Sequence, residues 1–169
     1  MPRRRPDDED GFASFAAVAA PRLGRTARLL TADRHLAEDL VQATLLAVYL
    51  RWRRVAAMDA PHPYAQRVLY TTFCSWRGRR WSAERPTDHL PERAAAGADP
   101  AERDGHGAVE AALARLPRRQ RAVVVARFYD DLSVEQTADL LGCTTGTVKT
   151  HTSRALHALR AVLGEAKVP

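Results

Sequence analysis

The sequence predicts an all-α protein built from two small helical domains joined by a flexible linker. Apolar residues recur at helical spacing over most of the chain, isoleucine is absent and strand signals are weak. Residues 82–104 lack this periodicity and separate two helical parts. Residues 133–160 have the pattern of a helix-turn-helix. A length of 169 residues allows one domain or two small ones.

The first predicted helix runs from Phe12 to about Leu30, after a charged tail, residues 1–11, that we expect to be disordered. Its apolar stripe consists of Phe12, Phe15, Ala16, Ala19, Leu23, Ala27 and Leu30. Pro21 lies within the stripe. We expect Pro21 to kink or split the helix, because proline lacks an amide hydrogen and its ring collides with the preceding turn.

A long second helix is predicted over residues 34–57, with Asp33 as its N-cap. Its apolar residues recur at intervals of four and three, and its exposed side is acidic at the start and basic at the end. Such a distribution of charge suits the helix dipole, so these charges also have a purely structural explanation.

Pro61-His62-Pro63 predicts a break, followed by a third helix over residues 64–79. One of its sides combines arginines with aromatic rings: Arg67, Tyr70, Phe73, Cys74 and Arg77. From Leu50 to Trp81 the chain carries seven arginines and one acid, Asp59. Rings interleaved with cations suit single-stranded DNA, because bases stack on the rings and cations follow the phosphates. An amphipathic core helix with a solvated basic face explains the composition equally well.

Residues 82–104 are predicted to be the linker, since they contain three prolines, six acids and three arginines. The second domain is expected to begin at residue 105. It opens with a short helix carrying Val109 to Leu116, and Pro117 suits the first turn of another helix that ends near Asp130. Three arginines at the start of that helix oppose its dipole, so a phosphate contact there is a plausible alternative to a structural role: Arg118, Arg119 and Arg121.

The helix-turn-helix is predicted from short-range signals. Ser133 and Gln136 match a capping box, and Gly142 is expected to end that helix in a left-handed conformation. A second helix starts at Thr144 or Thr145. Ala138 lies four residues before Gly142, where crossing helices approach closely, and Val148 lies six after it, where an apolar residue fills the space between them.

The side of the second helix opposite Val148 is small, polar and basic. These properties suit a helix that enters the DNA major groove. The alternative is an ordinary helical hairpin with a solvated basic face. The residues on this side are Gly146, Lys149, Thr150, Ser153, Arg154 and His157.

Composition and charge exclude several classes of protein. The net charge of +6 favours a polyanionic partner over an acidic small molecule. No apolar run approaches the ~18–20 residues of a membrane span, and the arginine-rich start lacks the apolar segment of a secretory signal. Cys74 and Cys143 show no metal-ligand spacing, so we expect no bound metal. Two cysteines far apart in sequence indicate a cytoplasmic protein with reduced thiols. We also expect no cofactor.

Three segments together resemble a bacterial RNA polymerase sigma factor of the extracytoplasmic-function (ECF) group, most like its actinobacterial SigE-type subfamily. They are residues 37–44 (AEDLVQAT), residues 112–133 (ALARLPRRQRAVVVARFYDDLS) and residues 146–156, which combine GTVK with SRAL. The resemblance covers about residues 12–81 and 105–163, which excludes the tail at 164–169.

The resemblance implies that residues 12–81 are region 2, which binds core polymerase and recognises and melts the minus-ten promoter element. A set of acidic and polar residues in the second helix would dock on the β′ clamp helices: Glu38, Asp39, Gln42 and Thr44. The third helix and the arginine-rich run after it would contact the minus-ten DNA through Arg67, Tyr70, Thr71, Phe73, Arg77, Arg79 and Arg80. Thr71 and Ser75 replace the Asn and Asp of most relatives, which leaves the preferred bases open.

Residues 105–163 would be region 4, which contacts the β flap and reads the minus-thirty-five element. The implied contacts are Thr145, Thr147, Lys149, Thr150, His151, Ser153 and Arg154. His151 replaces an arginine found in many relatives. The linker would thread toward the RNA exit channel, and an anti-sigma protein is a further candidate partner. The group has no catalytic residues of its own.

A helix-turn-helix regulator acting without replacing the polymerase sigma subunit is the alternative. It would explain residues 105–163 but would leave the helices of residues 34–81 without a role. An enzyme is disfavoured because the chain has no Gly-rich phosphate loop and no Ser/His/Asp pattern. A basic bundle that binds nucleic acid without specificity would account for the charge alone.

Overall fold

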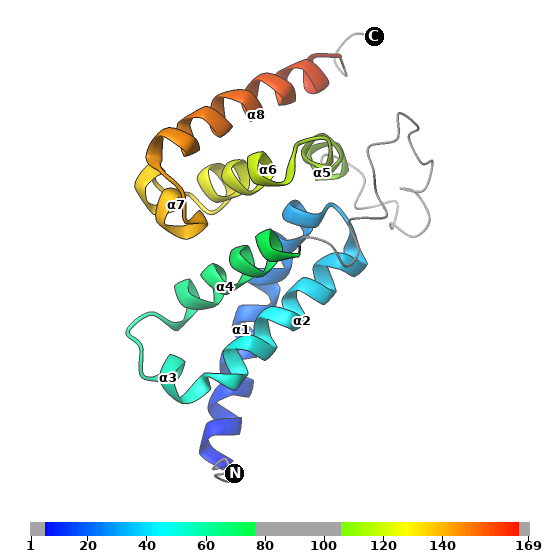
Figure 1. Ribbon diagram of the computed structural model, residues 1–169. Helices are drawn as coiled ribbons and strands as arrows, with labels where there is room; N and C mark the ends of the chain where they lie inside the picture. Colours follow the sequence, from blue (N-terminus) through cyan, green and yellow to red (C-terminus); the bar gives the residue numbers. More distant parts are fainter. Residues whose placement is uncertain (1–5, 77–105, 166–169) are drawn as a thin grey trace.

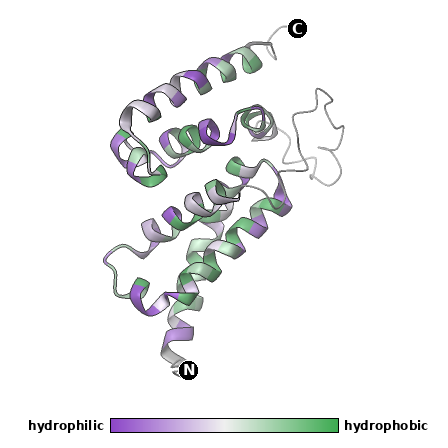
Figure 2. Cartoon of the chain, in the orientation of Figure 1, coloured by the Kyte–Doolittle hydropathy of each residue, from purple (hydrophilic) through white to green (hydrophobic). Residues whose placement is uncertain are grey.

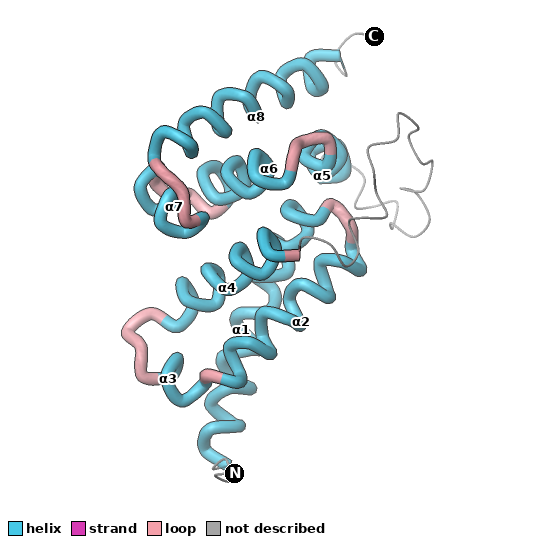
Figure 3. The backbone as a smooth tube through the Cα atoms, viewed as in Figure 1, coloured by secondary structure: helices cyan, strands magenta, loops and turns pink. Residues whose placement is uncertain are grey.

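The computed structural model describes residues 6–76 and 106–165 (Figure 1). The predicted linker, residues 82–104, and the tail residues 1–5 and 166–169 lie outside the described residues. Within the described ranges every element is helical, which confirms the all-α class (Figure 3). The first group of helices comprises α1 (Pro6–Thr31), α2 (Arg34–Leu50), α3 (Trp52–Ala56) and α4 (Pro61–Ser75). The second comprises α5 (His106–Ala114), α6 (Arg118–Val124), the π-helical turn η2 (Val125–Tyr129), α7 (Val134–Leu141) and α8 (Thr145–Glu165).

Helix α1 begins at Pro6, so the predicted disordered tail is wrong for residues 6–11. Proline suits a first helical turn, and the acids that follow it are stabilised by the positive end of the helix dipole. Tertiary contacts also hold this turn. Arg53 donates from Nε to Oδ2 of Asp8 at 3.0 Å. Gly11 packs against the indole of Trp52, since a Cβ added at Gly11 would lie 3.5 Å from Trp52 Nε1.

Pro21 does not split α1, which is continuous to Thr31. The predicted stripe is buried beneath it: Phe15, Ala19, Leu23, Ala27 and Leu30. Pro21 itself lies on the exposed side of the helix. There the carbonyl that loses its backbone donor can bond to water, so the proline is tolerated.

The predicted single helix over 34–57 is divided at Arg51, where the backbone turns to φ −115° and ψ 15°. Asp33 caps α2 as expected, because its Oδ1 accepts from the Leu36 amide at 2.9 Å. The break directs Trp52 onto two rings of α1, with centroids 5.5 Å from Phe12 and 5.1 Å from Phe15. Packing of the indole thus accompanies the interruption of the helix.

Helix α4 starts at Pro61, so the predicted break at residues 61–63 is instead its first turn. Proline fits there because that position needs no amide hydrogen. The helix ends at Ser75, four residues before the predicted end, and Trp76 is its C-cap. Residues 77–79 lie outside the described range.

One hydrophobic core runs through both groups of helices. It includes Leu30 and Leu40 from the first group and Leu116, Val125 and Ala155 from the second. In Figure 2 hydrophobic residues recur along α1, α2 and α6, which contribute to this core. Helix α1 contacts α5, α6 and η2, while α4 contacts α6 and α7. The two predicted halves are therefore packed against each other.

Candidate nucleic-acid interface

The helix-turn-helix has the local geometry that the sequence predicts. Ser133 Oγ accepts from the Gln136 amide at 3.0 Å, and Gln136 Oε1 accepts from the Ser133 amide at 2.8 Å, which completes the capping box. Gly142 ends α7 at φ 62°, a left-handed conformation that costs glycine little. Thr144 caps α8, because its Oγ1 accepts from the Thr147 amide at 3.1 Å.

A small apolar cluster fixes the crossing of α7 and α8. Ala138, Val148 and Val123 of α6 are all buried within it. Val148 is fully buried, as expected for the residue that fills the space between the helices. Because this cluster holds the inner face of α8, the opposite face is presented outward in a fixed orientation.

The outward face of α8 contains most of the residues predicted to contact the minus-thirty-five element. Thr145, Lys149, Thr150, Ser153 and Arg154 are exposed. The hydroxyl of Thr150 donates to the Gly146 carbonyl at 3.0 Å, which leaves its lone pairs directed outward. This face therefore offers two cationic groups and three hydroxyls close together on one helix.

Two predicted contacts on α8 are less accessible. Thr147 is partly buried, and its hydroxyl is hydrogen-bonded to the hydroxyl of Thr144 at 2.9 Å. His151 is partly buried, its Nδ1 is buried without a hydrogen-bond partner, and it lines a small cavity together with Cys74 and Cys143. Burial, and then the positive charge of Arg154 and Arg119, lowers the pKa of His151.

The predicted minus-ten residues on α4 fall into two groups. Arg67 and Thr71 are exposed, and the Thr71 hydroxyl donates to the Arg67 carbonyl at 2.8 Å. Tyr70 and Phe73 are fully buried against the second group of helices, so in this arrangement they are not exposed for the minus-ten contacts that the resemblance implies. The remaining predicted contacts, Arg77, Arg79 and Arg80, lie outside the described residues.

The Tyr70 and Phe73 rings contact specific groups of the second half. Tyr70 Oη donates to Oδ2 of Asp130 at 2.6 Å. The guanidinium carbon of Arg118 lies 5.7 Å from the Phe73 ring centroid, within the range of a cation–π contact. Burial above all, and then the negative charge of Asp130, raises the pKa of Tyr70 well above its ordinary value.

The α2 residues predicted to bind polymerase also differ in exposure. Glu38 and Gln42 are exposed, Asp39 is partly buried and Thr44 is fully buried. Because the Thr44 hydroxyl donates to the Leu40 carbonyl at 2.8 Å inside the core, a direct contact with a partner is excluded in this structure.

The surface predicted to bind polymerase also includes residues of α1, which the sequence analysis does not name as part of it. Glu38 and Gln42 border a groove of about 600 Å³ between α1 and α2, whose floor includes apolar residues of both helices. The signal available in the sequence is a pair of small residues in the first helix, Ala20 and Gly24, at four-residue spacing. The α1 residues that line the groove are Ala20, Pro21, Gly24, Arg25 and Arg28.

The phosphate contact suggested for the arginines of α6 is wrong for Arg121, which is buried. Its Nη1 donates to the Leu30 carbonyl at 2.8 Å, and its Nη2 donates to the carbonyls of Ala114 at 2.9 Å and Leu116 at 3.1 Å. Arg119 is exposed and Arg118 is partly buried over Phe73.

Known proteins place these features in a family. Residues 106–159 match the family model described as Sigma-70, region 4. The chain is 35% identical over 153 residues to the RNA polymerase sigma-E factor of Streptomyces avermitilis, covering 90% of this chain and 84% of that protein. It is 31% identical over 149 residues to the ECF RNA polymerase sigma factor ShbA of Streptomyces griseus, covering 82% and 77% of the two chains.

The chain belongs to the ECF group of RNA polymerase sigma factors. As a sigma factor it acts in transcription initiation with core RNA polymerase and promoter DNA, and the reading as a separate helix-turn-helix regulator is not favoured. A solved structure of the sigma factor RpoE in complex with the anti-sigma factor NepR, from Bartonella quintana, is similar at a TM-score of 0.71 with 25% identity. That likeness covers 91% of this chain and 97% of the other, so it includes both halves of the sigma factor.

Within the described residues, no helix is both long and apolar enough to cross a membrane. In the same part of the chain, His, Cys, Asp and Glu side chains form no group of three or more that could hold a metal ion.

Proposed function

We propose that residues 12–81 form the sigma region 2 domain and residues 105–163 the region 4 domain, joined by the linker of residues 82–104. In this scheme region 2 binds core polymerase and opens the minus-ten element, while region 4 binds the minus-thirty-five element. The match of residues 106–159 to Sigma-70, region 4 supports the start of the second domain.

The outward face of α8 is the observation on which the promoter-reading role depends. Lys149 and Arg154 can donate to guanine acceptors or to phosphates, and the hydroxyls of Thr150 and Ser153 can bond to more than one base. All four are exposed on a helix whose opposite face is buried. Thr145 lies on the first turn, Thr147 and His151 are partly buried, and we assign these three to the edges of the contact.

The minus-ten role is assigned to α4 and the arginines that follow it. Arg67 and Thr71 are exposed and available to a DNA strand. Tyr70 and Phe73 can stack on bases only if the second half moves away from α4, because both rings are fully buried now. The DNA-bound arrangement of the two halves therefore differs from the one described here. Arg77, Arg79 and Arg80 keep the minus-ten role that the resemblance implies.

Polymerase binding is assigned to the groove between α1 and α2. Val41 and Leu45 give it an apolar floor, and Glu38 and Gln42 add polar groups at the edge. An apolar lining with polar groups beside it suits a helical surface such as the β′ clamp helices. Asp39 lies beside it on the same helix. Region 4 would contact the β flap.

Three further properties follow from this assignment. The chain would perform no catalytic step, since the polymerase carries out the chemistry, and it would act in the cytoplasm. An anti-sigma factor is a candidate partner, because a similar sigma factor was solved in complex with one.

Run-off transcription with purified core polymerase tests the proposal. The template is a library of random upstream sequences, and reactions are run with and without this chain. The expected result is a set of transcripts whose templates share two boxes at a fixed spacing. Absence of transcripts together with absence of co-elution with core polymerase would overturn it.

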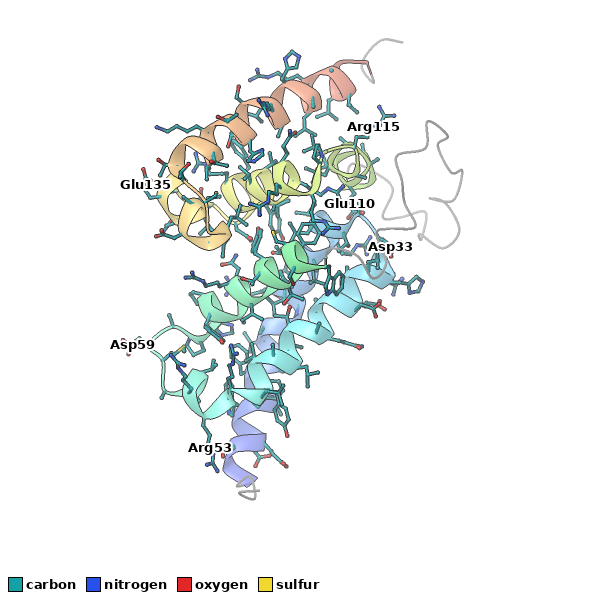
Figure 4. The ribbon with its side chains drawn as sticks, viewed as in Figure 1. Asp33, Arg53, Asp59, Glu110, Arg115 and Glu135 are labelled. Carbon is teal, nitrogen blue, oxygen red and sulfur yellow. The ribbon has the colours of Figure 1, made fainter. Side chains whose placement is uncertain are left out.

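Matched variants assign the surfaces. Replacement of Lys149 and Arg154 by Ala should abolish selection of the upstream box, whereas Arg160→Ala, an exposed arginine six residues beyond Arg154 toward the C-terminal end of α8, should not. Glu38→Ala combined with Gln42→Ala should weaken co-elution with core polymerase. Asp59→Ala is the control for that pair, because Asp59 is exposed in the loop before α4, away from the groove (Figure 4).

A further inference from the structure

A polar cavity of about 610 Å³ lies where α1, α4 and the end of η2 meet. Apart from Arg25, which also borders the groove between α1 and α2, no residue that lines it is assigned to DNA or polymerase. Its volume falls within the range of ~300–1,000 Å³ that small-molecule sites occupy in proteins. Cationic, anionic, aromatic and apolar side chains all line it, and such a mixture suits a polar organic ligand.

Asp130 is held firmly at the wall of this cavity. Its Oδ2 accepts from Tyr70 Oη of α4 at 2.6 Å, and its Oδ1 accepts from Thr26 Oγ1 of α1 at 3.2 Å. Both donors are buried, with Tyr70 at 0% and Thr26 at 4% exposure, so they fix the orientation of the carboxylate. An ionised carboxylate has about four acceptor positions, so each oxygen keeps one. Because Asp130 is partly exposed and lines the cavity, this pair of acceptors is available to a ligand.

Two adjacent acceptors on one carboxylate match a ligand with two adjacent donors. Guanine has such an edge, because its N1–H and its N2 amino group lie side by side. On the corresponding edge of adenine the N6 amino group lies beside the N1 lone pair, which a carboxylate oxygen repels. The carboxylate of Asp130 therefore favours guanine over adenine.

An aromatic ring and an amide adjoin this carboxylate in the cavity. Tyr129 precedes Asp130, lines the same cavity and is 45% exposed, so its ring is available to stack on a planar base. On the α4 wall, His62 is held by stacking on Phe15, with ring centroids 4.7 Å apart. Gln66 lies one turn further along α4 and also lines the cavity, where its amide can donate to the O6 acceptor of guanine.

Arg22 and Arg25 supply positive charge on the α1 wall. Arg22 lies four residues, or ~6 Å along the helix, before the Thr26 that holds Asp130. Both arginines are exposed, and within residues 6–76 and 106–165 neither forms an ion pair with a carboxylate. A guanidinium group binds phosphate through two parallel hydrogen bonds. Two arginines against one carboxylate therefore favour an anionic ligand, such as one that carries a diphosphate.

We propose that this cavity binds a free guanine nucleotide. Asp130 accepts from the N1–H and N2 amino edge of the base, Tyr129 stacks on the base, and Arg22 and Arg25 bind the phosphates. The nucleotide contacts α1, α4 and the end of η2 at once. The inference does not depend on which surface of the chain contacts promoter DNA.

Isothermal titration of the purified full chain with GDP tests the site, with ADP and inorganic pyrophosphate as the comparison ligands. GDP should bind at least tenfold more tightly than either, and it should raise the melting temperature of the chain because it binds the folded form. Equal affinities for GDP and ADP, or no binding of GDP at millimolar concentration, would overturn the proposal. A guanine-containing DNA oligonucleotide that displaces GDP and binds more tightly would also overturn it, because the cavity would then belong to a nucleic-acid surface.

Asp130→Asn tests the contact with the base through a change of preference. The asparagine amide can donate where the carboxylate accepts, so it suits xanthine, in which a carbonyl oxygen replaces the N2 amino group. The variant should bind GDP at least tenfold more weakly than wild type and should prefer xanthosine 5′-diphosphate to GDP. Asp131→Asn, at an exposed position that does not line the cavity, is the matched control and should keep the wild-type preference. An Asp130→Asn variant that still prefers GDP would contradict the role of the carboxylate.

Arg22→Gln tests the phosphate contact at an exposed position, where substitution leaves the fold intact. The variant should bind GDP at least fivefold more weakly and should bind guanosine as wild type does, because guanosine has no phosphate. Arg115→Gln, in the loop that follows α5, is the matched control and should bind GDP normally. Circular dichroism confirms that each variant is folded. Unchanged GDP binding by Arg22→Gln, or an equal loss for GDP and guanosine, would overturn the assignment of the phosphates to this wall.

Discussion

Arg121 on α6 donates a hydrogen bond from Nη1 to the carbonyl oxygen of Leu30 at the end of α1, 91 residues earlier in the sequence. The same guanidinium donates from Nη2 to the carbonyls of Ala114, the last residue of α5, and of Leu116 in the loop that follows. One buried side chain therefore satisfies carbonyls of two helix ends and connects the two halves of the sigma factor.

Replacement of Arg121 by Met should destabilise the chain by about 2–4 kcal/mol, because three carbonyls in the interior lose a charged donor. Urea denaturation of the full chain measures the change. Arg115→Met, at an exposed position in the loop that follows α5, is the matched control and should change the free energy of unfolding by less than ~0.5 kcal/mol. Equal effects of the two substitutions would contradict the structural role of Arg121.

Val148 is expected to be the most sensitive position of the helix-turn-helix. Val148→Ala should cost about 2–3 kcal/mol, because it leaves a cavity between α7 and α8 beside the buried Ala138 and Val123. Denaturant unfolding gives the magnitude, with Thr150→Ala on the exposed face as a control. A loss no greater than that of the control would mean that α8 is positioned by other contacts.

The features predicted correctly from the sequence are local ones. The capping box of Ser133 and Gln136, the left-handed Gly142 and the packing of Ala138 against Val148 all depend on residues within one short segment. In such a segment the order of residue types is nearly sufficient to specify the backbone.

The features predicted incorrectly depend on contacts between distant segments. Helix α4 packs on two sides: one side buries Ala65 and Leu69, and the other buries Tyr70 and Phe73. An arginine-rich sequence likewise gives no sign that Arg121 is buried, since the carbonyls that it bonds come from two other helices. Thr44 is fully buried for the same reason, because α1 and α4 pack against α2, whereas a partner contact predicts that Thr44 is exposed.

Arg154 provides a test of how α8 reads DNA. If Arg154 makes a bidentate contact with a guanine, Arg154→Ala should weaken promoter binding by the holoenzyme by ~1–3 kcal/mol, and the loss should disappear on templates changed at that base pair. Filter binding across single-base template variants measures this. An equal loss on every template, with a smaller salt dependence, would instead identify Arg154 as a phosphate contact.

His151 predicts a pH dependence of stability. Burial, with a contribution from Arg154 and Arg119, lowers its pKa below the ordinary value of 6.5, so the folded chain favours the neutral imidazole. Below pH 6.5 the unfolded chain takes up a proton at this residue before the folded chain does. The stability associated with the neutral imidazole is therefore present above pH 6.5 and is lost as the pH falls through the folded pKa.

The measurement is urea unfolding of wild type and His151→Gln between pH 7.5 and pH 5. The free energy of unfolding of wild type should fall more steeply with acidification than that of the variant, because glutamine cannot take up the proton. His157→Gln, at an exposed position on the same helix, should retain the wild-type slope. Parallel slopes for wild type and His151→Gln would show that the imidazole is equally accessible to protons in the folded and unfolded chains, and that its position beside Cys143 has no energetic consequence.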